Sequence, residues 1–394
     1  MKRRSLPAAL AAALLLAPLA AVAQPKPIKI GFFFDLTGGG ATASEAAQFG
    51  ASLAVSEINA AGGIGGRKVE YVIADTQTDA TIGVGEIKRL VLQEKVDIVL
   101  GPLISQVLIA AAPVLNEAKI ASIGSTGSEL ITPALAPYYF SALVNAEAQA
   151  KAMVAQSIDG LKAKSVAILS DNGAQAKSFV DSIKKELGAR NLRITGTQEY
   201  AYRATDMTPQ LLALRRGNPD TLLLFTSNGE DAGNALKSLD EVGWKVKVTG
   251  NYSVAAFAAV AVGVAGKEAF ENVTGTNYRA FTYCDGGAKP QAYLDFVAKA
   301  KAFKPAEAAR LSMPFASLMY EGTYLMKAAI EASGGKTDGP TIAAWIEANA
   351  KSYNGVLGAL AATKDSHFLI GVDSLTAVHP ARFGEGGIQQ RLGC

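Results

Sequence analysis

Two rounds of alternating strand-like and helix-like segments constrain the fold of this chain more than any other feature of its sequence. Strands that alternate with helices form parallel sheets covered by helices on both faces. The first round combines apolar runs at 28–34, 69–75, 97–100 and 120–123 with helical periodicity at 44–61, 80–95 and 105–118. The second combines expected strands at 165–170, 192–200, 221–225 and 246–250 with helices at 145–158, 174–190, 206–216 and 230–242. The sequence therefore predicts two α/β units of about 120 residues, then helices at 291–302, 315–332 and 341–350 and a short strand-like tail.

The composition is that of a globular protein with sizeable cores, since 49% of the 394 residues are hydrophobic and 19% are charged. The chain has 38 Lys and Arg residues and 35 Asp and Glu residues. Three of the cations, Lys2, Arg3 and Arg4, belong to an N-terminal segment that looks removable, which leaves 35 residues of each sign. A neutral protein has no net electrostatic attraction to nucleic acid or anionic lipid. We therefore expect no nucleic-acid partner.

The first 23 residues have the pattern of an export signal. The cations at 2–4 precede an apolar run at 6–20, and Ala21-Val22-Ala23 is a cleavage site of the small-x-small type. A membrane anchor is the alternative, but the run is shorter than the roughly 20 residues that span a bilayer and contains Pro18. We expect signal peptide 1–23 to be cleaved after Ala23 and the mature protein to be soluble and extracytoplasmic.

Cys284 and Cys394 are the only cysteines in the chain. In an oxidising compartment two cysteines allow a single disulfide. A bridge between them and two free thiols are both compatible with the sequence.

Residue patterns typical of catalysis, metal binding and nucleotide binding are weak. His367 and His379 are the only imidazoles, so a general base poised near neutral pH is scarce. No His, Cys or Asp ligands are paired at metal-binding spacing. The glycine-rich stretch 38–43 matches a dinucleotide-binding pattern, but Asp75 follows it by about 32 residues rather than about 20. We therefore interpret 38–43 as a ligand-facing loop and expect no enzymatic activity, no cofactor and no metal.

Small polar residues follow the expected strands where an open α/β sheet binds its ligand. Ser105 begins a helix after one strand, and Gly124, Ser125 and Thr126 end the next strand. Their hydroxyl groups, with the N–H groups of a helix start, suit a carboxylate and need no arginine. Ordinary N-capping is the alternative interpretation of these serines and threonines. The second unit offers Gln175, Ser227, Asn228 and Tyr252 at equivalent strand ends.

Several segments resemble the type I periplasmic binding proteins, in particular the leucine/isoleucine/valine-binding branch that feeds ABC importers. The resemblance is carried by 28–37, by Leu53-Ala54-Val55-Ser56-Glu57-Ile58-Asn59-Ala60-Ala61-Gly62-Gly63-Ile64-Gly65-Gly66-Arg67-Lys68-Val69-Glu70, by the Gly101-Pro102 turn before Ser105, and by Thr126 to Leu130. It implies an α/β fold with two doubly wound parallel-sheet lobes joined by a three-strand hinge. The implied lobes are 24–142 with 276–357 and 143–275 with 358–394, and the implied crossings lie near 141–145, 274–278 and 356–363.

The resemblance also implies roles for individual residues. Ser105 and Thr126 match side-chain ligands of the family's amino-acid carboxylate and amine, and Gly124 and Ser125 match backbone contacts. Tyr252 stands where amino-acid binders place an acid against the ammonium, and burying an ammonium without an acid is costly. A flat carboxylate beside Tyr252 is therefore preferred to a zwitterionic amino acid. The expected ligand-binding residues are Ala43, Leu103, Ser105, Gly124, Ser125, Thr126, Gln175, Ser227, Asn228 and Tyr252.

The expected function is that of a monomeric, non-enzymatic solute-binding protein of an ABC importer. Its ligand would be a small carboxylate, either an aromatic or keto acid or a branched-chain amino acid, and its partner a membrane permease. A ligand-sensing receptor domain and a periplasmic enzyme acting on a small acid are the alternatives.

Overall fold

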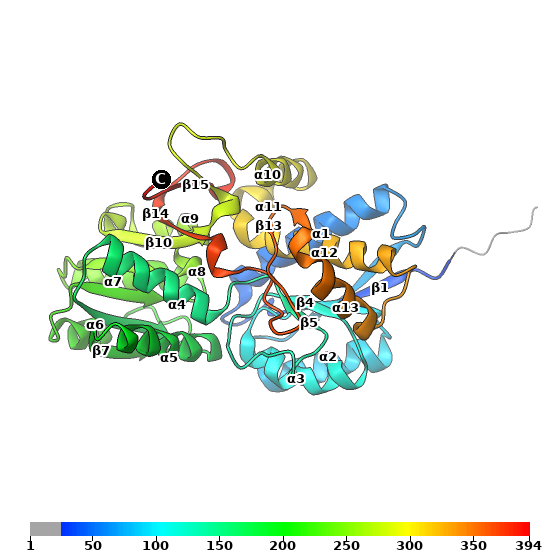
Figure 1. The fold of residues 1–394 in the computed structure, drawn as a ribbon, viewed down its shortest axis with the longest axis horizontal. Coiled ribbons are helices and arrows are strands. Elements are labelled where there is room, and N and C mark those ends of the chain that lie inside the picture. Colours follow the sequence, from blue (N-terminus) through cyan, green and yellow to red (C-terminus); the bar gives the residue numbers. More distant parts are fainter. Residues whose placement is uncertain (1–24) are drawn as a thin grey trace, which may run out of the picture.

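The computed structural model describes residues 25–394, so the predicted signal peptide and its cleavage site lie outside the described residues. Two sheets organise the described chain, one with strand order β2-β1-β3-β4-β5 and one with order β11-β15-β14-β10-β9-β8-β6-β7. Figure 1 shows them as two lobes side by side, each with helices packed against its sheet. The predicted α/β architecture of two lobes is confirmed.

The first lobe forms because its strands are almost wholly apolar and its helices alternate with them. All its strand pairs are parallel, and β1 lies between β2 and β3. Six of the seven residues of β1 are buried, as expected for an interior strand of a parallel sheet. The elements of this round are β1 (Ile28–Phe34), α1 (Ala41–Ala60), β2 (Val69–Asp75), α2 (Ala80–Lys88), β3 (Ile98–Leu100), α3 (Ser105–Glu117), β4 (Ser122–Gly124) and β5 (Tyr139–Ser141).

The second lobe repeats the alternation and adds antiparallel strands. Strand β14 pairs antiparallel with both β10 and β15, so the predicted strand-like tail extends an otherwise parallel sheet. Its elements are α4 (Ala146–Ala155), β6 (Ser165–Asp171), α5 (Ala174–Ala189), β7 (Arg193–Tyr200), α6 (Thr208–Arg215), β8 (Thr221–Phe225), α7 (Gly229–Glu241), β9 (Lys247–Gly250), α8 (Tyr252–Ala256), α9 (Ala258–Ala265), β10 (Val273–Tyr278), β11 (Thr282–Tyr283), β14 (Leu375–Phe383) and β15 (Gln389–Arg391).

The helices after β11 return to the first lobe. These are α10 (Gln291–Phe303), α11 (Pro305–Arg310), α12 (Met313–Ala332) and α13 (Gly339–Asn349), followed by the hairpin β12 (Asn354–Gly355) and β13 (Gly358–Ala359). Figure 1 shows α12 lying along α1, and the two helices share one apolar core with β1. No helix within residues 25–394 is long and apolar enough to cross a membrane.

Three connections pass between the lobes. They are 142–145 between β5 and α4, 284–290 between β11 and α10, and 360–374 between β13 and β14. The predicted second crossing at 274–278 lies inside β10, because this fully buried strand pairs with β9 and β14 of the second sheet. The chain therefore leaves the second lobe after β11, later than residue 276.

A disulfide joins Cys284 to Cys394, with the two Cα atoms 5.8 Å apart. Of the two states that the sequence left open, the structure shows the bridge. It ties the segment after β11 to the residues that follow β15.

Candidate functional site

A small cavity lies where the two lobes meet, beside the carboxyl ends of the first-lobe strands β3 and β4. Its volume is about 20 Å³, which is room for little more than one water molecule. Its wall consists of Ala43, Leu103, Ile104, Ser105, Gln106, Ser125, Leu143 and Phe315 on one side and Gln175, Tyr202, Ser227 and Ser253 on the other. The lobes are therefore closed on each other in this structure.

Ser125, directly after β4, is the most informative side chain of this wall. Its Oγ atom is buried and has no hydrogen-bond partner among the described residues. A buried polar group without a partner costs free energy, so its presence in a cavity wall points to a ligand or an ordered water. Ser125 is thus a hydrogen-bond donor available to an atom in the cavity.

Ser105, the first residue of α3, adds donors beside Ser125. Its Oγ accepts hydrogen bonds from the backbone N–H groups of Gly127 and Ser128, each over 3.3 Å, so its own O–H remains free to donate. Within residues 25–394 the N–H groups of Ser105 and Gln106 have no partner, as is usual at a helix start. The positive end of the helix dipole favours an anion there. This corner can hold a carboxylate without a cationic side chain.

Thr126 and Gly124, which flank Ser125, lie behind the wall rather than in it. The Oγ1 of Thr126 is hydrogen-bonded to the Tyr139 hydroxyl at 2.9 Å, and Thr126 is fully buried. Gly124 packs so closely on Pro102 that a side chain at position 124 would overlap the Pro102 carbonyl. Of the first-lobe residues that we predicted, Ala43, Leu103, Ser105 and Ser125 reach the cavity, and Thr126 and Gly124 position the loop.

Two of the four second-lobe residues in the wall, Ser227 and Tyr202, already bond to each other. Ser227 donates to the buried carboxylate of Asp171 over 2.7 Å, and the Tyr202 hydroxyl donates to Ser227 Oγ over 3.4 Å. The backbone N–H of Gly173 also donates to Asp171. Burial is the largest influence on Asp171 and raises its pKa to about 7. Of the second-lobe residues that we predicted, Gln175 and Ser227 line the cavity.

Two predicted contacts, Tyr252 and Asn228, lie outside the wall. Tyr252 is fully buried and stacks on Tyr278 with ring centroids 4.3 Å apart. Asn228 caps α7, where its Oδ1 accepts from the Asp231 N–H over 2.7 Å. The Asn228 side chain is thus used in capping and the Tyr252 ring in packing, while the buried Tyr252 hydroxyl has no hydrogen-bond partner among the described residues.

The aromatic rings of the wall are instead Tyr202 and Phe315, which sequence reasoning missed. Tyr202 follows β7, so the strand-end rule that selected Ser227 could have found it. Phe315 comes from α12, where helical periodicity indicates only a core residue. The ring of Tyr202 also lies against Gly39 of the first lobe, since a side-chain carbon at position 39 would sit 3.2 Å from it. The stretch 38–43 thus faces the cavity, although α1 begins at Ala41, three residues earlier than predicted.

The wall of the cavity is electrically neutral, since no Asp, Glu, Lys, Arg or His stands among its described lining residues. A second buried acid, Asp35, lies behind the first-lobe side, where it accepts from the Leu103 N–H at 3.2 Å. Burial raises the pKa of Asp35 to about 6. Within residues 25–394 no three His, Cys, Asp or Glu side chains are arranged to hold a metal ion.

Direct contacts close the rim of the cleft. Thr42 donates to Glu230 across the lobes over 2.8 Å, and Ser128 shares a hydrogen bond of 2.9 Å with Ser178. Gly127 also lies so close to Gln175 that a side chain at position 127 would overlap it. A solute can enter only if the lobes separate, because these contacts seal a cavity of about 20 Å³.

Comparison with known proteins places this geometry in context. The chain is 27% identical over 350 residues to the Leu/Ile/Val-binding protein BraC3 of Rhizobium johnstonii, a match that covers 87% of this chain and 88% of the relative. The branched-chain amino acid transporter substrate-binding protein LivJ of Streptococcus pneumoniae, solved with isoleucine, matches with a TM-score of 0.76 and 23% identity over 92% of this chain and 98% of that one. An ABC transporter solute-binding protein of R. palustris, solved with 4-hydroxybenzoate, matches with a TM-score of 0.78 and 19% identity over 94% and 96%.

The two structural matches show the fold, and a family model covers most of the sequence. The model described as periplasmic binding protein matches residues 27–382, which include the first lobe, all three connections and most of the second lobe. The chain therefore belongs to the periplasmic binding protein family.

Proposed function

We propose that this chain is a periplasmic solute-binding protein that closes on a small carboxylate between its lobes and delivers it, as a monomer, to the permease of an ABC importer. The observation that carries this proposal is the unpartnered Oγ of Ser125, buried in the cavity wall beside the free N–H groups of α3. These groups can donate hydrogen bonds to a carboxylate, and the carboxylate oxygens would be the acceptors that the groups now lack. Binding and closure, with no chemical step, are what the two lobes and the neutral wall support.

A carboxylate with an aromatic or keto body suits this wall better than a zwitterionic amino acid. The rings of Tyr202 and Phe315 line the cavity, and none of its described lining residues carries a charge. An ammonium there would lose its hydration and gain no acid in direct contact. Asp171 stands one hydrogen bond behind Ser227, so it is the acid that a branched-chain amino acid would have to reach. The isoleucine and 4-hydroxybenzoate of the two structural matches represent these two ligand classes.

Opening and closing are part of the proposed cycle. The closed cavity of about 20 Å³ is far smaller than a benzoate, so the lobes must separate to admit one. A ligand that contacts both walls favours a state in which the lobes close around it, with a wider cavity than the empty closed form has, and shifts the population toward that state. The three connections between the lobes allow such a hinge motion.

Ser125 and Ser122 provide a matched pair of variants for testing the site. Both side chains are buried with an unpartnered Oγ, but only Ser125 lines the cavity. A thermal-shift panel of 4-hydroxybenzoate, phenylpyruvate, leucine and isoleucine selects the ligand, and calorimetry then measures its affinity. We expect Ser125→Ala to weaken binding by about 1.5–3 kcal/mol and Ser122→Ala to leave it unchanged. Equal affinity in Ser125→Ala and the unmodified protein would contradict the proposed site.

A further inference from the structure

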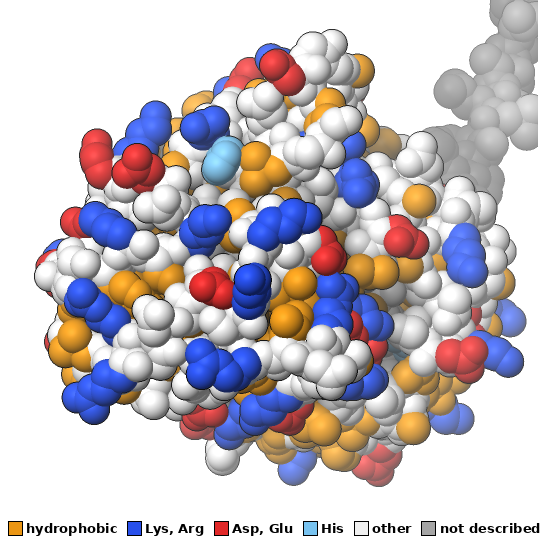
Figure 2. Space-filling model, turned by 60° about the vertical axis from the view of Figure 1, so that its left-hand side comes forward, with side chains coloured by type: hydrophobic (Ala, Val, Ile, Leu, Met, Phe, Trp, Pro, Cys, Tyr) orange, Lys and Arg blue, Asp and Glu red, His pale blue; other side chains and the backbone are white. Residues whose placement is uncertain are grey.

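A second, much larger cavity lies on the second lobe, away from the cleft. Its volume is about 830 Å³, and it shares no lining residue with the cavity between the lobes. Its wall comes from α4, the end of α5, β10 and the turn after it, β14, and the end of β15 with the residues that follow, together with Cys284 and Val372 from two of the connections between the lobes. Figure 2 shows Lys and Arg side chains outnumbering Asp and Glu side chains on a face to which this lobe contributes. Nothing in the proposed solute-binding cycle uses this cavity.

The charges in its wall are strongly unbalanced. Four cationic side chains line it, Lys151, Arg190, Arg279 and Arg391, against the single acid Glu186. Two of the cations have partners outside the wall, because Lys151 pairs with Glu147 at 2.6 Å and Arg190 with Asp159 at 3.1 Å. Arg279 and Arg391 form no ion pair with any acid of residues 25–394. Glu186 offsets one of the two remaining positive charges, so the side chains leave the cavity a net charge of about +1.

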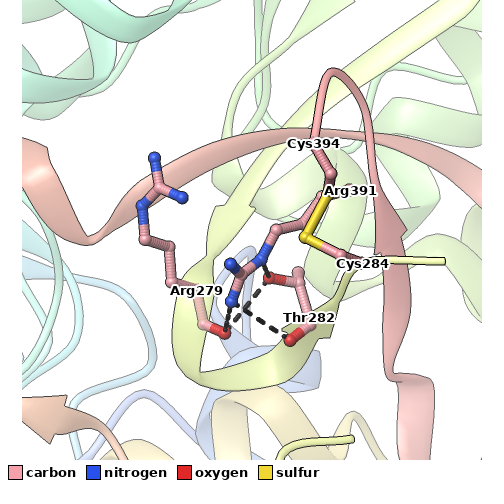
Figure 3. Close-up of a disulfide and its surroundings, with 5 residues drawn as sticks. All are labelled: Arg279, Thr282, Cys284, Arg391 and Cys394. Atoms are coloured by element: carbon pink, nitrogen blue, oxygen red, sulfur yellow. Dashed lines mark hydrogen bonds between the residues drawn. A yellow bond between two sulfur atoms is a disulfide. The ribbon is translucent and has the colours of Figure 1, made fainter. Parts of the chain in front are cut away.

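Figure 3 shows the Arg391 guanidinium directed at Thr282 and at the Arg279 carbonyl, with the Arg279 side chain extending away from it. The Nε of Arg391 donates to Thr282 Oγ1 over 2.8 Å, and one Nη donates to the Arg279 carbonyl over 2.9 Å. The Nε of Arg279 donates to the Asp373 carbonyl over 3.0 Å. Both Nη groups of Arg279 and one of Arg391 have no partner among the described residues. Burial and the neighbouring charge of Arg279 lower the pKa of Arg391, so an anion here would relieve a repulsion.

The disulfide fixes the wall of the cavity beside these arginines. Cys284 and Cys394 both line it, and the bridge holds residues 392–394 next to the turn that carries Thr282. Arg391 therefore presents its guanidinium from a strand end that is covalently anchored. Such a pre-ordered donor loses little conformational entropy when it binds.

We propose that this cavity binds a small organic anion with two or more carboxylate or phosphate groups, at a site separate from the solute cleft. The two free Nη groups of Arg279 can hold one carboxylate or phosphate through two parallel hydrogen bonds, and the free Nη of Arg391 can donate to a second such group. Apolar wall residues, among them Ala152, Leu375 and Leu392, would contact the carbon skeleton between them. The volume of about 830 Å³ falls within the range of about 300–1,000 Å³ that is usual for small-molecule sites.

Calorimetric titration of the full chain with citrate tests this site, with pyrophosphate as the phosphate probe and acetate as the single-charge control. A salt concentration of about 0.15 M screens long-range attraction. We expect citrate or pyrophosphate to bind at least tenfold more tightly than acetate. Arg279→Gln should weaken that binding at least tenfold. Arg391→Gln, read together with its melting temperature, should do the same.

Two further variants separate this site from general charge and from the cleft. Lys184→Gln removes an exposed cation of α5 that lies outside the cavity, and it should leave citrate binding unchanged. Ser125→Ala should also leave it unchanged, because Ser125 belongs to the cleft. The proposal is overturned if neither polyanion binds more tightly than acetate, if Lys184→Gln weakens binding as much as Arg279→Gln does, or if Ser125→Ala abolishes it. None of these results would decide whether a carboxylate binds in the cleft.

Discussion

On the first-lobe wall of the cleft, the hydroxyl of Ser125 and the first N–H groups of α3 lack partners within the described chain, whereas on the second-lobe wall Ser227 and Tyr202 are bonded to each other and Ser227 to Asp171. One wall offers unused donors at fixed positions, and the other offers an aromatic ring held in a network. This difference indicates that the two walls have different roles in ligand binding. The first lobe supplies the anion's hydrogen bonds, and the second closes over its body and decides which bodies fit.

The largest expected difference between the two walls is in how the acid behind each makes the free energy of unfolding depend on pH. The pKa of Asp171 is raised by burial from 3.8 to about 7, so between those values the folded chain holds a proton that the unfolded chain has released. The free energy of unfolding should therefore fall as pH rises from about 4 to about 7, by about 1 kcal/mol per pH unit. Chemical denaturation at a series of pH values measures this slope.

Replacing the buried acid behind each wall in turn shows how much of the pH dependence each acid causes. Asp171→Asn should remove the part of the slope due to this acid up to about pH 7, and Asp35→Asn on the first-lobe side should remove its part only up to about pH 6, because the pKa of Asp35 is raised less. Below about pH 6 each variant should keep a shallower slope, since the other acid and Asp231 also have raised pKa values. A slope unchanged in Asp171→Asn would mean that the second-lobe network does not hold a proton.

Removal of the second-lobe ring should cost ligand affinity. Tyr202→Ala deletes the ring that lines the cavity and lies against Gly39 of the first lobe. We expect roughly thirtyfold weaker binding, or about 2 kcal/mol. Calorimetry with the selected carboxylate measures this loss, and Tyr202→Phe serves as the control that keeps the ring. If both variants bind alike and weakly, the hydroxyl rather than the ring matters.

Loss of the Ser105 hydroxyl should act on the first wall in two ways. Ser105→Ala removes a donor to the ligand and leaves the N–H groups of Gly127 and Ser128 without their acceptor. We expect about 1–2 kcal/mol less ligand affinity and a similar loss in the free energy of unfolding. Affinity retained alongside reduced stability would assign Ser105 to the support of the loop alone.

The contact between the lobes at the rim should have the smallest effect. Thr42→Val removes the hydrogen bond to Glu230, which exists only when the lobes are closed. Closure then becomes less favourable, and we expect about threefold weaker affinity, or about 0.6 kcal/mol. Thr195→Val on the edge strand β7 is the control, since its hydroxyl bonds within the second lobe. An identical effect of the two variants would show that the rim contact does not bias closure.

Local patterns predicted the frame of this molecule well, because strands and helices follow short-range periodicity. The strands 28–34, 69–75 and 221–225 have the predicted bounds. The crossing predicted at 274–278 was misplaced, since the pairings of β10 with β9 and with β14, about 100 residues later in the chain, show that this segment belongs to the second sheet.

The site was partly predictable because local sequence patterns also show where strands end. Ser105, Ser125 and Ser227 follow strand ends, where ligands bind in open α/β sheets, and all three line the cavity as this rule predicts. The direction of a side chain within a loop depends on tertiary packing, which no spacing rule contains. The Tyr252 ring therefore packs on Tyr278 instead of lining the cavity, and Phe315 lines the cavity from a helix 190 residues after Ser125.

A crystal structure of the chain with the tightest carboxylate of the thermal-shift panel tests the central claim most directly. We predict carboxylate oxygens about 2.5–3.0 Å from the Oγ atoms of Ser125 and Ser105, with the ring or chain of the ligand between Tyr202 and Phe315. A ligand seated elsewhere while the Ser125 hydroxyl stays without a partner would contradict the account.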